Sequence, residues 1–437
     1  IAAIALPVAL QNLIGFGVNM TDTLMLGALG EAQLSAVSLA NQPFFVFGIL
    51  AFGIASGVSV LTAQYWGRGD ILPIRRVFAI AIDISTLVSL LFFVAAFFFS
   101  REIMGIFSTE EQIIELGAQY LKIISFSYIF FGISSTYLSS IRSVEQVKIP
   151  LLVYGTSFLI NAAINYVLIF GKFGFPALGV RGAAIGTLTA RVVEFVIVFV
   201  YMRFYEKKIR LRFRDLLRID KIMFGDYLRH GMPVMFNELV WSVGMAIQSV
   251  IIGRIGSDFV AANSIVGVFQ QLTTIVIFGM ANAAAVVVGK AVGKGDNEHV
   301  RRCADTLLLL SLGVGILGAA IMLSLRGVAI GFYNVPDSTK QIANSIMIIA
   351  SINVVFVSLN SINLMGTLRG AGDTRFAFVA DTILIWVLSA PLGILSGWVL
   401  GLPAWAVFIC LRMDEPLKAI AIIARIKGTK WINNVTR

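Results

Sequence analysis

Two acidic side chains, Asp22 and Glu238, lie inside long apolar segments with no basic residue near them in the sequence. A charged side chain at the centre of a lipid bilayer costs about 2.5–3.5 kcal/mol on insertion scales, so such a residue is a functional candidate. An unpaired carboxylate in apolar surroundings takes up a proton or binds a cation. Either event can couple ion movement to a conformational change, which is the chemistry of a secondary transporter.

Neutral polar side chains in later apolar segments are candidate companions of Asp22. Asn161 and Asn165 lie one helical turn apart on one face, and Thr187 lies in the next segment. With one carboxylate, these side chains could bind Na⁺ or hold a protonated Asp22. The alternative is that each asparagine makes an ordinary hydrogen bond between helices, worth about 0.6 kcal/mol on average. For each residue alone the alternative is favoured, whereas the cluster as a whole favours a cation-coupling site.

The remaining acids inside apolar segments have basic neighbours in the sequence. Two pairs with a spacing of three residues predict ion pairs within one helix, Arg191–Glu194 and Arg412–Glu415. Asp83 and Asp381 lie within about two helical turns of loops that contain arginines, and side chains at that depth reach the membrane interface easily. For these two acids, interfacial and functional roles remain equally open.

The elements that position these residues are predicted to be membrane helices. The chain has 437 residues, of which 58% are hydrophobic and 13% charged, whereas soluble proteins carry about 25% charged residues. Its apolar stretches are long enough to cross a bilayer and lack the alternation of barrel strands. We predict twelve spans, at residues 2–28, 34–63, 76–99, 117–140, 150–171, 182–202, 230–255, 260–289, 303–325, 341–366, 376–397 and 399–424. Charged residues interrupt the last span, so its lipid-spanning part is expected to end near Leu411.

Basic residues are concentrated in every second loop. The loop after the sixth predicted span and the C-terminal tail carry most of them. The loop has Arg203, Lys207, Lys208, Arg210, Arg212, Arg214, Arg218 and Lys221, and the tail has Arg425, Lys427, Lys430 and Arg437. The positive-inside rule therefore places these loops and both termini in the cytoplasm, and predicts a multi-pass protein of the plasma (inner) membrane. The net charge of +10 is explained by this asymmetry, so no nucleic-acid partner is predicted.

The sequence repeats itself after 226 residues. Matched pairs are Pro7–Pro233, Gly27–Gly253, Gly53–Gly279, Gly67–Gly293, Gly69–Gly295 and Asp70–Asp296. Because each half has an even number of spans, the halves form a parallel repeat. We predict an N-lobe at 1–202, a basic cytoplasmic linker at 203–229 and a C-lobe at 230–437, as two six-helix bundles around a central cavity. Duplicated bundles can be simply stable, but this arrangement favours transport by alternating access.

The sequence gives little support for a metal site, an enzymatic site or a cofactor site. Cys303 and Cys410 are far apart in the sequence without metal-ligand spacing, and His230 and His299 form no cluster. No nucleophile–base pair or phosphate-binding loop is found, so the chain is not predicted to be an enzyme or to hold a cofactor besides the coupling ion, H⁺ or Na⁺. Because the chain opens on Ile1 inside an apolar segment, we expect its natural N-terminus to lie further upstream.

Several motifs together resemble the multidrug and toxic compound extrusion (MATE) family, on its bacterial NorM-like side. They are DTLMLG at 22–27, QYWGRGD at 64–70, its echo GKAVGKGD at 289–296, PALGVRGAAIGT at 176–187, LRGAGDT at 368–374 and KW at 430–431. Each motif is weak alone, but in this order they cover the whole chain. The resemblance implies twelve helices in two lobes and export of bulky, often cationic, amphipathic compounds driven by inward H⁺ or Na⁺.

The resemblance also implies functional positions. The N-lobe cation site of the family matches Asp22, Asn161, Asn165 and Thr187 in this sequence. Some members carry a second acid where this chain has Asn165. The site here therefore holds one formal charge, and electrostatics would hold Na⁺ more weakly.

In the C-lobe the family pattern is incomplete. NorM-type proteins place a glutamate where we align Trp241 and an aspartate where this chain has Ser358. Glu238 lies three residues before Trp241 on nearly the same face, and it is expected to attract cationic substrate. The substrate-cavity candidates are Asn237, Glu238, Trp241, Ser358, Asn360 and Asn363.

The alternative function is a flippase or exporter of a lipid-linked precursor or another endogenous metabolite. Such a cavity should carry basic residues that meet phosphates, whereas the central candidates here are acidic and Arg191 is the only base well inside a span. The primary expectation is therefore a monomer in the lipid bilayer that exports small organic cations.

Overall fold

The computed structural model describes residues 1–211, 213–216, 220–333 and 335–436. Arg212, Arg218 and Arg437, which were predicted to be cytoplasmic, lie outside the described residues, as does the side chain of Arg214. The described residues form helices and no strand. The prediction of an all-α fold is confirmed.

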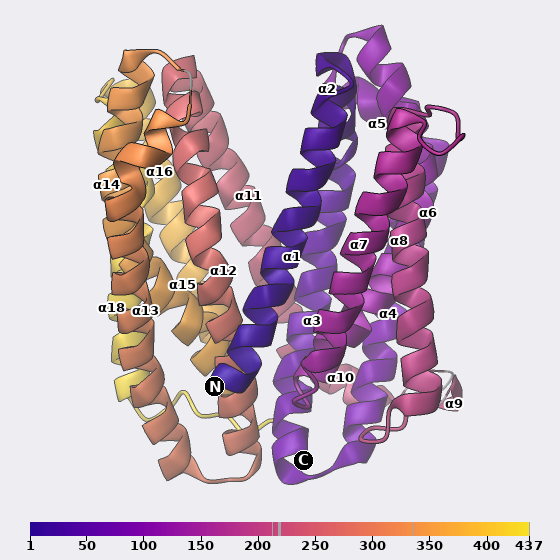
Figure 1. Ribbon diagram of the computed structural model, residues 1–437. Helices are drawn as coiled ribbons and strands as arrows, with labels where there is room; N and C mark the ends of the chain where they lie inside the picture. The colour runs from indigo at the N-terminus through magenta and orange to yellow at the C-terminus, as the bar shows by residue number, and fades with distance from the viewer. Residues whose placement is uncertain (212, 217–219, 334, 437) are drawn as a thin grey trace. The chain divides into compact units, whose positions relative to one another are not determined.

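The chain divides into two compact units. The N-terminal unit comprises Leu10–Thr62 and Asp70–Leu228, and the C-terminal unit comprises Ile1–Ala9, Ala63–Gly69 and Arg229–Arg437. Within each unit the long helices run side by side (Figure 1). The two units are described separately below.

The N-terminal unit contains the helices of the first half of the chain, except for the start of α1 and the ends of α3 and α10. In chain order, these helices are α1 (Ala2–Gly27), α2 (Glu31–Ala40), α3 (Gln42–Arg68), α4 (Ile71–Phe98), α5 (Ser100–Phe107), α6 (Glu111–Arg142), α7 (Lys148–Phe170), α8 (Val180–Val200), η1 (Tyr201–Tyr205), α9 (Phe213–Leu216) and α10 (Lys221–His230). Aromatic rings join three of them, since Phe47 of α3 stacks on Tyr128 of α6 and contacts Phe92 of α4. Such ring pairs add about 0.5–1.5 kcal/mol each beyond the area that they bury.

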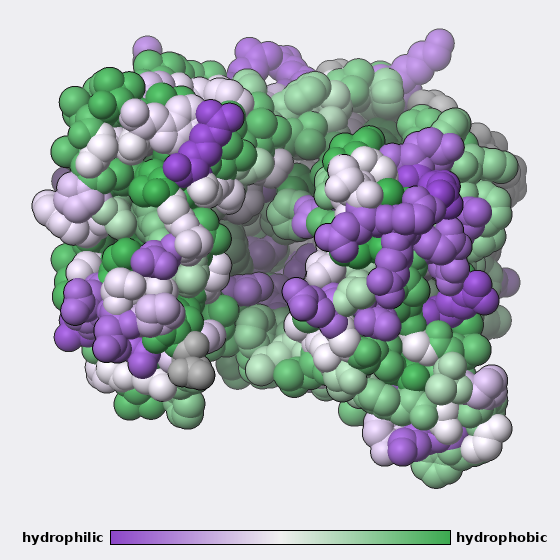
Figure 2. Space-filling view, turned by 90° about the horizontal axis from the view of Figure 1, so that it is seen from above, coloured by the Kyte–Doolittle hydropathy of each residue, from purple (hydrophilic) through white to green (hydrophobic). Residues whose placement is uncertain are grey.

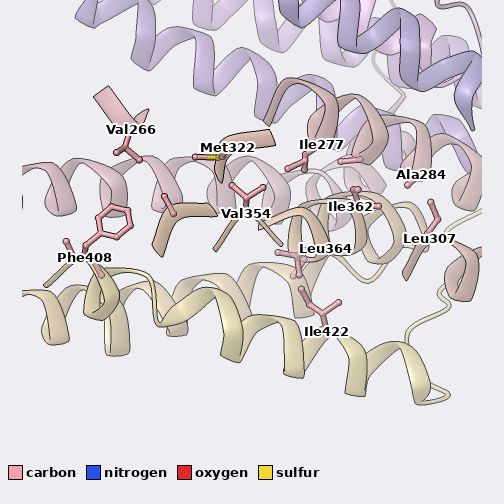
Figure 3. Close-up of a cluster of buried hydrophobic side chains, with 14 of the residues drawn as sticks. Val266, Ile277, Ala284, Leu307, Met322, Val354, Ile362, Leu364, Phe408 and Ile422 are labelled. Carbon is pink, nitrogen blue, oxygen red and sulfur yellow. The ribbon is translucent and has the colours of Figure 1, made fainter. Parts of the chain in front are cut away.

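The C-terminal unit holds the second half of the helices. They are α11 (Met232–Ile255), α12 (Ser257–Gly293), α13 (Asn297–Gly331), α14 (Asp337–Asn360), η2 (Ser361–Leu368), α15 (Thr374–Ile383), η3 (Leu384–Ser389), α16 (Ala390–Ile394), η4 (Leu395–Val399), α17 (Ala404–Leu411) and α18 (Asp414–Lys427). Apolar side chains from α12, α13, α14, α17 and α18, among them Val266, Leu307, Val354, Phe408 and Ile422, pack into one buried cluster (Figure 3). This cluster holds the helices of the unit together.

Eleven helices in the described part of the chain are long and apolar enough to cross a membrane. The outer surface agrees with this, because α4 exposes 60–65% of Leu87, Leu91 and Phe98, and soluble proteins rarely expose such large apolar patches. Seen from above, hydrophilic residues gather on the face turned toward the viewer, and hydrophobic residues make up much of its outline (Figure 2). The chain is a multi-pass membrane protein.

The predicted twelfth span, 399–424, is broken in the structure. Helix α17 ends at Leu411, as expected, and α18 begins at Asp414 after a turn. Neither helix is among the eleven long apolar helices. Of the charged residues that interrupt this segment, Asp414, Glu415 and Lys418 therefore lie on α18, and Arg412 lies in the turn before it.

The repeated Gly-x-Gly-Asp motif has the same local structure in both halves. Gly69 and Gly295 adopt left-handed backbone angles, with φ of 82° and 78°, which only glycine adopts at little cost. The aspartates that follow cap the next helices, since Asp70 accepts a hydrogen bond from the Leu72 N–H and Asp296 accepts one from the His299 N–H. The motif thus ends one long helix and begins the next.

The first glycine of each motif allows α3 and α12 to touch. Within the C-terminal unit, a Cβ on Gly67 would collide with the carbonyl of Lys290, and a Cβ on Gly293 would collide with the carbonyl of Gln64. Gln64 also holds the C-terminal segment, because its amide donates to the Asn433 carbonyl at 3.2 Å and accepts from the Val435 N–H at 2.8 Å. The repeat is therefore visible as a reciprocal backbone contact.

We expect Gly293→Ala to lower the melting temperature of the detergent-solubilised protein. The obstacle is backbone, which cannot rotate away, so the cost should be about 1–3 kcal/mol, as for other overpacked sites. Gly313→Ala is the control, since a Cβ there meets open space among the described residues. Equal melting temperatures for the two variants would contradict the contact.

Candidate functional site

A chain of polar side chains links α1, α7 and α8 in the N-terminal unit. The Asn165 amide donates to Asp22 Oδ1 at 2.7 Å and to Asn161 Oδ1 at 3.3 Å. The Asn161 amide in turn donates to Thr187 Oγ1 at 3.2 Å. Asn161 and Asn165 are buried, at 2% and 0% exposure, whereas Asp22 and Thr187 are partly exposed. The structure thus brings together all four residues of the predicted cation-coupling set.

The geometry of this polar cluster follows from helix periodicity. Asn161 and Asn165 are four residues apart on α7, so both side chains project from one face. Asp22 lies on the last turns of α1, and Thr187 lies near the start of α8. Each of the three helices contributes at least one polar group, so the cluster also connects the helices.

Gly186 completes the cluster and was missed in the sequence analysis. A Cβ on this residue would collide with Oδ1 of Asn165, so the Asn165 amide is packed against the α8 backbone. This close approach turns the nitrogen of the amide toward Asp22 and Asn161. The available signal was the position of Gly186 directly before Thr187 within a motif that was already identified.

Two further side chains lie near Asp22. They are Tyr120 of α6, a neutral phenol, and Arg191 of α8, whose positive charge favours the ionised carboxylate. The Tyr120 hydroxyl lies 3.3 Å from the side-chain oxygen of Asn41, to which it donates. Nothing in the sequence marked Tyr120, because a phenol inside a span is most often a packing residue.

Arg191 is held by its own partner. Its guanidinium donates to Glu194 Oε2 at 2.7 Å, which confirms the predicted ion pair. The ring of Phe131 lies 4.7 Å from the guanidinium carbon, and Ser157 also donates to Glu194. The arginine therefore adds positive potential near Asp22 without forming a direct ion pair with it.

Glu238 in the C-terminal unit is paired, which corrects the expectation of an isolated acid. Arg369 donates to Glu238 Oε1 at 2.7 Å and to the Asn237 side-chain oxygen at 2.5 Å. Arg369 lies 131 residues further along the chain, so proximity in the sequence could not reveal it. Glu238 is only 8% exposed, so its charge is largely neutralised before any substrate arrives.

Asp381 belongs to the same polar region. It accepts from Asn237 at 2.8 Å and forms an ion pair with Lys418 of α18 at 2.6 Å. Asp381 is only 6% exposed, so the structure speaks against the interfacial role, and a functional role for it stays a prediction. Asp83 on α4, by contrast, is partly exposed.

The predicted Arg412–Glu415 ion pair is wrong. Glu415 lies 3.6 Å from the Lys418 ammonium and accepts from the Asn360 amide at 2.6 Å. The helix break at 412–413 removes the continuous turn on which the prediction depended. Arg412 instead stacks near Phe408, 5.5 Å from the ring centre.

The other substrate-cavity candidates have different surroundings. Ser358 donates to the Ser311 carbonyl at 2.7 Å, and Asn363 donates to the Ser311 hydroxyl at 3.1 Å, so both buried residues hold α13. Asn360 is engaged by Glu415, as described above. Trp241 alone among these candidates is substantially exposed, at 36%.

We expect Arg369→Gln to destabilise the protein by about 3–5 kcal/mol, because it leaves the buried Glu238 carboxylate without a counter-ion. The measurement is thermal unfolding in detergent. Arg302→Gln is the control, because Arg302 pairs with Glu298 on an exposed surface, where such pairs contribute about 0–1 kcal/mol. The double variant Glu238→Gln/Arg369→Gln should be more stable than Arg369→Gln. A loss as small as that of the control would contradict a buried ion pair.

The model of the MatE family matches residues 7–167 and 233–395. A probable multidrug resistance protein NorM from Rhizobium meliloti is 30% identical over 396 residues, which cover 88% of this chain and 83% of that protein. A protein of the same description from Thermotoga maritima is 27% identical over 407 residues, covering 91% and 87% of the two chains.

Solved structures show the same fold. A MOP superfamily transporter from Pyrococcus furiosus superposes with a TM-score of 0.87 at 18% identity, covering 98% of this chain and 96% of that chain. A eukaryotic MATE transporter superposes with a TM-score of 0.86 at 18% identity, covering 99% and 96%. At this level of identity the likeness concerns the fold alone.

Proposed function

Because the chain belongs to the MatE family of membrane transporters, we propose that it is a multidrug exporter driven by cation antiport, with Asp22 as the carrier of the coupling proton. The observation that carries this proposal is the buried Asn161–Asn165 pair, which presents an amide N–H to the single carboxylate of Asp22. The curated relatives described as multidrug resistance proteins support the substrate class.

A proton suits this site better than Na⁺. The nearest amide directs its N–H, rather than its oxygen, at the carboxylate, whereas Na⁺ is held by oxygen atoms. Na⁺ at Asp22, Asn161, Asn165 and Thr187 remains the alternative, and the experiment below separates the two ions.

Protonation changes the strength of the contact between α1 and α7. With Asp22 ionised, the Asn165 N–H makes a charge-assisted hydrogen bond, worth about 1.5–3 kcal/mol. With Asp22 neutral, the same bond contributes about 0.5–1.5 kcal/mol. Uptake of one proton therefore weakens the link between these helices and biases the conformation of the N-terminal unit. A ligand shifts an equilibrium only through such a difference between states.

We propose that the substrates are small amphipathic organic compounds, often cationic. Few basic residues lie inside the spans, and the guanidinium groups of Arg191 and Arg369 are already paired with glutamates. An anionic substrate would therefore find few free cations to bind. We further propose that the lobes 1–202 and 230–437 alternate in access while 203–229 links them, with both termini in the cytoplasm of a bacterial cell.

The test is efflux of a fluorescent organic cation from everted membrane vesicles that contain the protein. We expect an imposed proton gradient to drive transport in Na⁺-free buffer, and a protonophore to stop it. An imposed Na⁺ gradient alone should drive little transport. Transport that follows the Na⁺ gradient would assign the site to Na⁺, and transport that follows neither gradient would contradict antiport.

A further inference from the structure

A second group of ionisable side chains is buried in the C-terminal unit, around the ammonium of Lys418. Three carboxylates approach this ammonium: Asp381 at 2.6 Å, Asp414 at 3.4 Å and Glu415 at 3.6 Å. Lys418 and Asp414 are 3% and 4% exposed. We call these four residues the Lys418 cluster. It comes from α15 and α18 and uses none of the residues of the Asp22 site.

The cluster holds more negative than positive groups. The other charged side chains that face it are Arg412, which acts electrostatically on Asp414, and the Glu238–Arg369 pair, which is joined to Asp381 through Asn237. Among the described residues, the neutral Asn360 at the end of α14 also contacts the cluster, through Glu415. Four carboxyl groups thus share three cations. Because an unpaired buried charge costs several kcal/mol, this excess of carboxyl groups favours the uptake of a proton by one of them.

The hydrogen bonds distinguish the carboxyl groups from one another. Both oxygens of Asp381 are engaged, one by Lys418 and one by Asn237. Both oxygens of Glu415 likewise have partners, Lys418 and Asn360. Asp414 has only its longer contact with Lys418, and its Oδ1 is buried without a partner among the described residues. Oδ1 of Asn360 is also buried there without a partner.

We propose that the Lys418 cluster is a second proton-binding site of the transporter, with Asp414 as the group that takes up and releases the proton. This inference rests on the proposed function in that the site would serve the same proton-driven cycle. The step is the addition of one proton to the Asp414 carboxylate, which forms a neutral carboxyl group and leaves Lys418 to Asp381 and Glu415. Release of the proton restores the three-carboxylate arrangement.

A chain of polar contacts connects the Lys418 cluster with the Glu238–Arg369 pair. Glu415, with a side chain 14% exposed, lies at one end, and Glu238, 11% exposed, lies at the other. Lys418, Asp381, Asn237 and Arg369 connect them through the contacts given above. These contacts make the Lys418 cluster part of one continuous polar region of the C-terminal unit.

The direct test is infrared spectroscopy of the purified full-length protein in lipid nanodiscs during a pH titration. In an Asp22→Asn background, a protonated-carboxyl band that disappears at high pH should remain, because it belongs to the second site. Adding Asp414→Asn should remove that band, whereas Asp414→Glu should shift it and keep it titratable. Glu298→Gln, which changes an exposed acid on α13, is the matched control and should leave the band unchanged.

Transport supplies the second readout. In everted vesicles, Asp414→Asn should lower proton-driven efflux of tetraphenylphosphonium by about fivefold or more, the size of a typical coupling energy, and Asp414→Glu should restore much of it. Comparable melting temperatures of the variants establish that folding is intact. A band that persists in the Asp22→Asn/Asp414→Asn protein, or full efflux by folded Asp414→Asn, would overturn the proposal. Neither result tests the role of Asp22. That role would be contradicted separately, if efflux by the wild-type protein did not depend on the proton gradient.

Discussion

Cells that express Asp22→Asn should lose resistance to organic cations, with proton-driven efflux reduced by about a hundredfold, the upper range of a typical coupling energy. Asparagine keeps the shape of the side chain and the contact with Asn165, but it cannot bind or release a proton. The protein should still insert and fold, because the change removes a partly buried charge. The measurement is minimum inhibitory concentration together with the accumulation of a fluorescent cation.

Asp83→Asn is the matched control for this variant. Asp83 is an aspartate within a long apolar helix of the same unit, but it takes no part in the hydrogen bonds of the Asp22 cluster. We expect it to retain near wild-type efflux at equal expression. Full resistance in cells with Asp22→Asn would rule out the proposed coupling site, and equal losses in both variants would indicate a general effect of removing membrane acids.

Gly186→Ala should impair efflux although it changes no polar group. The added methyl group collides with the Asn165 amide and displaces it from Asp22 and Asn161. Loss of one charge-assisted hydrogen bond, worth about 1.5–3 kcal/mol, corresponds to roughly a 10- to 100-fold change in the coupling equilibrium. The expected result is a drop of about that size in proton-driven efflux, together with a shifted pH dependence.

Gly155→Ala is the control for the added methyl group. Gly155 lies on α7, where a Cβ meets only Ile14 Cδ1 at 4.0 Å, an ordinary contact. This variant should transport normally. If Gly186→Ala also transports normally with an unchanged pH profile, the position of the Asn165 amide does not matter for coupling.

Local patterns in the sequence predicted the helices and the shared face of Asn161 and Asn165, whereas the meeting of Asp22 with Asn165 joins residues 143 positions apart and was implied by the family resemblance. The positions of Asn161 and Asn165 follow from helix periodicity, and the Arg191–Glu194 ion pair lies within one helix, so both needed only short-range rules. The Gly-x-Gly-Asp repeats also encode their own helix end and helix start. These features depend on residues within a few positions of each other.

The C-terminal polar region could not be predicted in the same way. Glu238 and Arg369 are far apart in the sequence, and so are Asp381 and Lys418, so only the packing of helices reveals that they meet. The predicted Arg412–Glu415 pair failed because a helix break separates the two residues. The charged residues that interrupt the last predicted span were the only indication of these ion pairs in the sequence, since charges buried at such depth require partners.

The exchange of protons for substrate can be measured most directly in Na⁺-free proteoliposomes that contain the purified protein and a trapped pH indicator. When an organic cation flows down its own gradient through the wild-type protein, the account predicts opposing proton movement and a change of lumenal pH, which Asp22→Asn should abolish. Movement of the cation through the wild-type protein without any change of lumenal pH would contradict proton antiport.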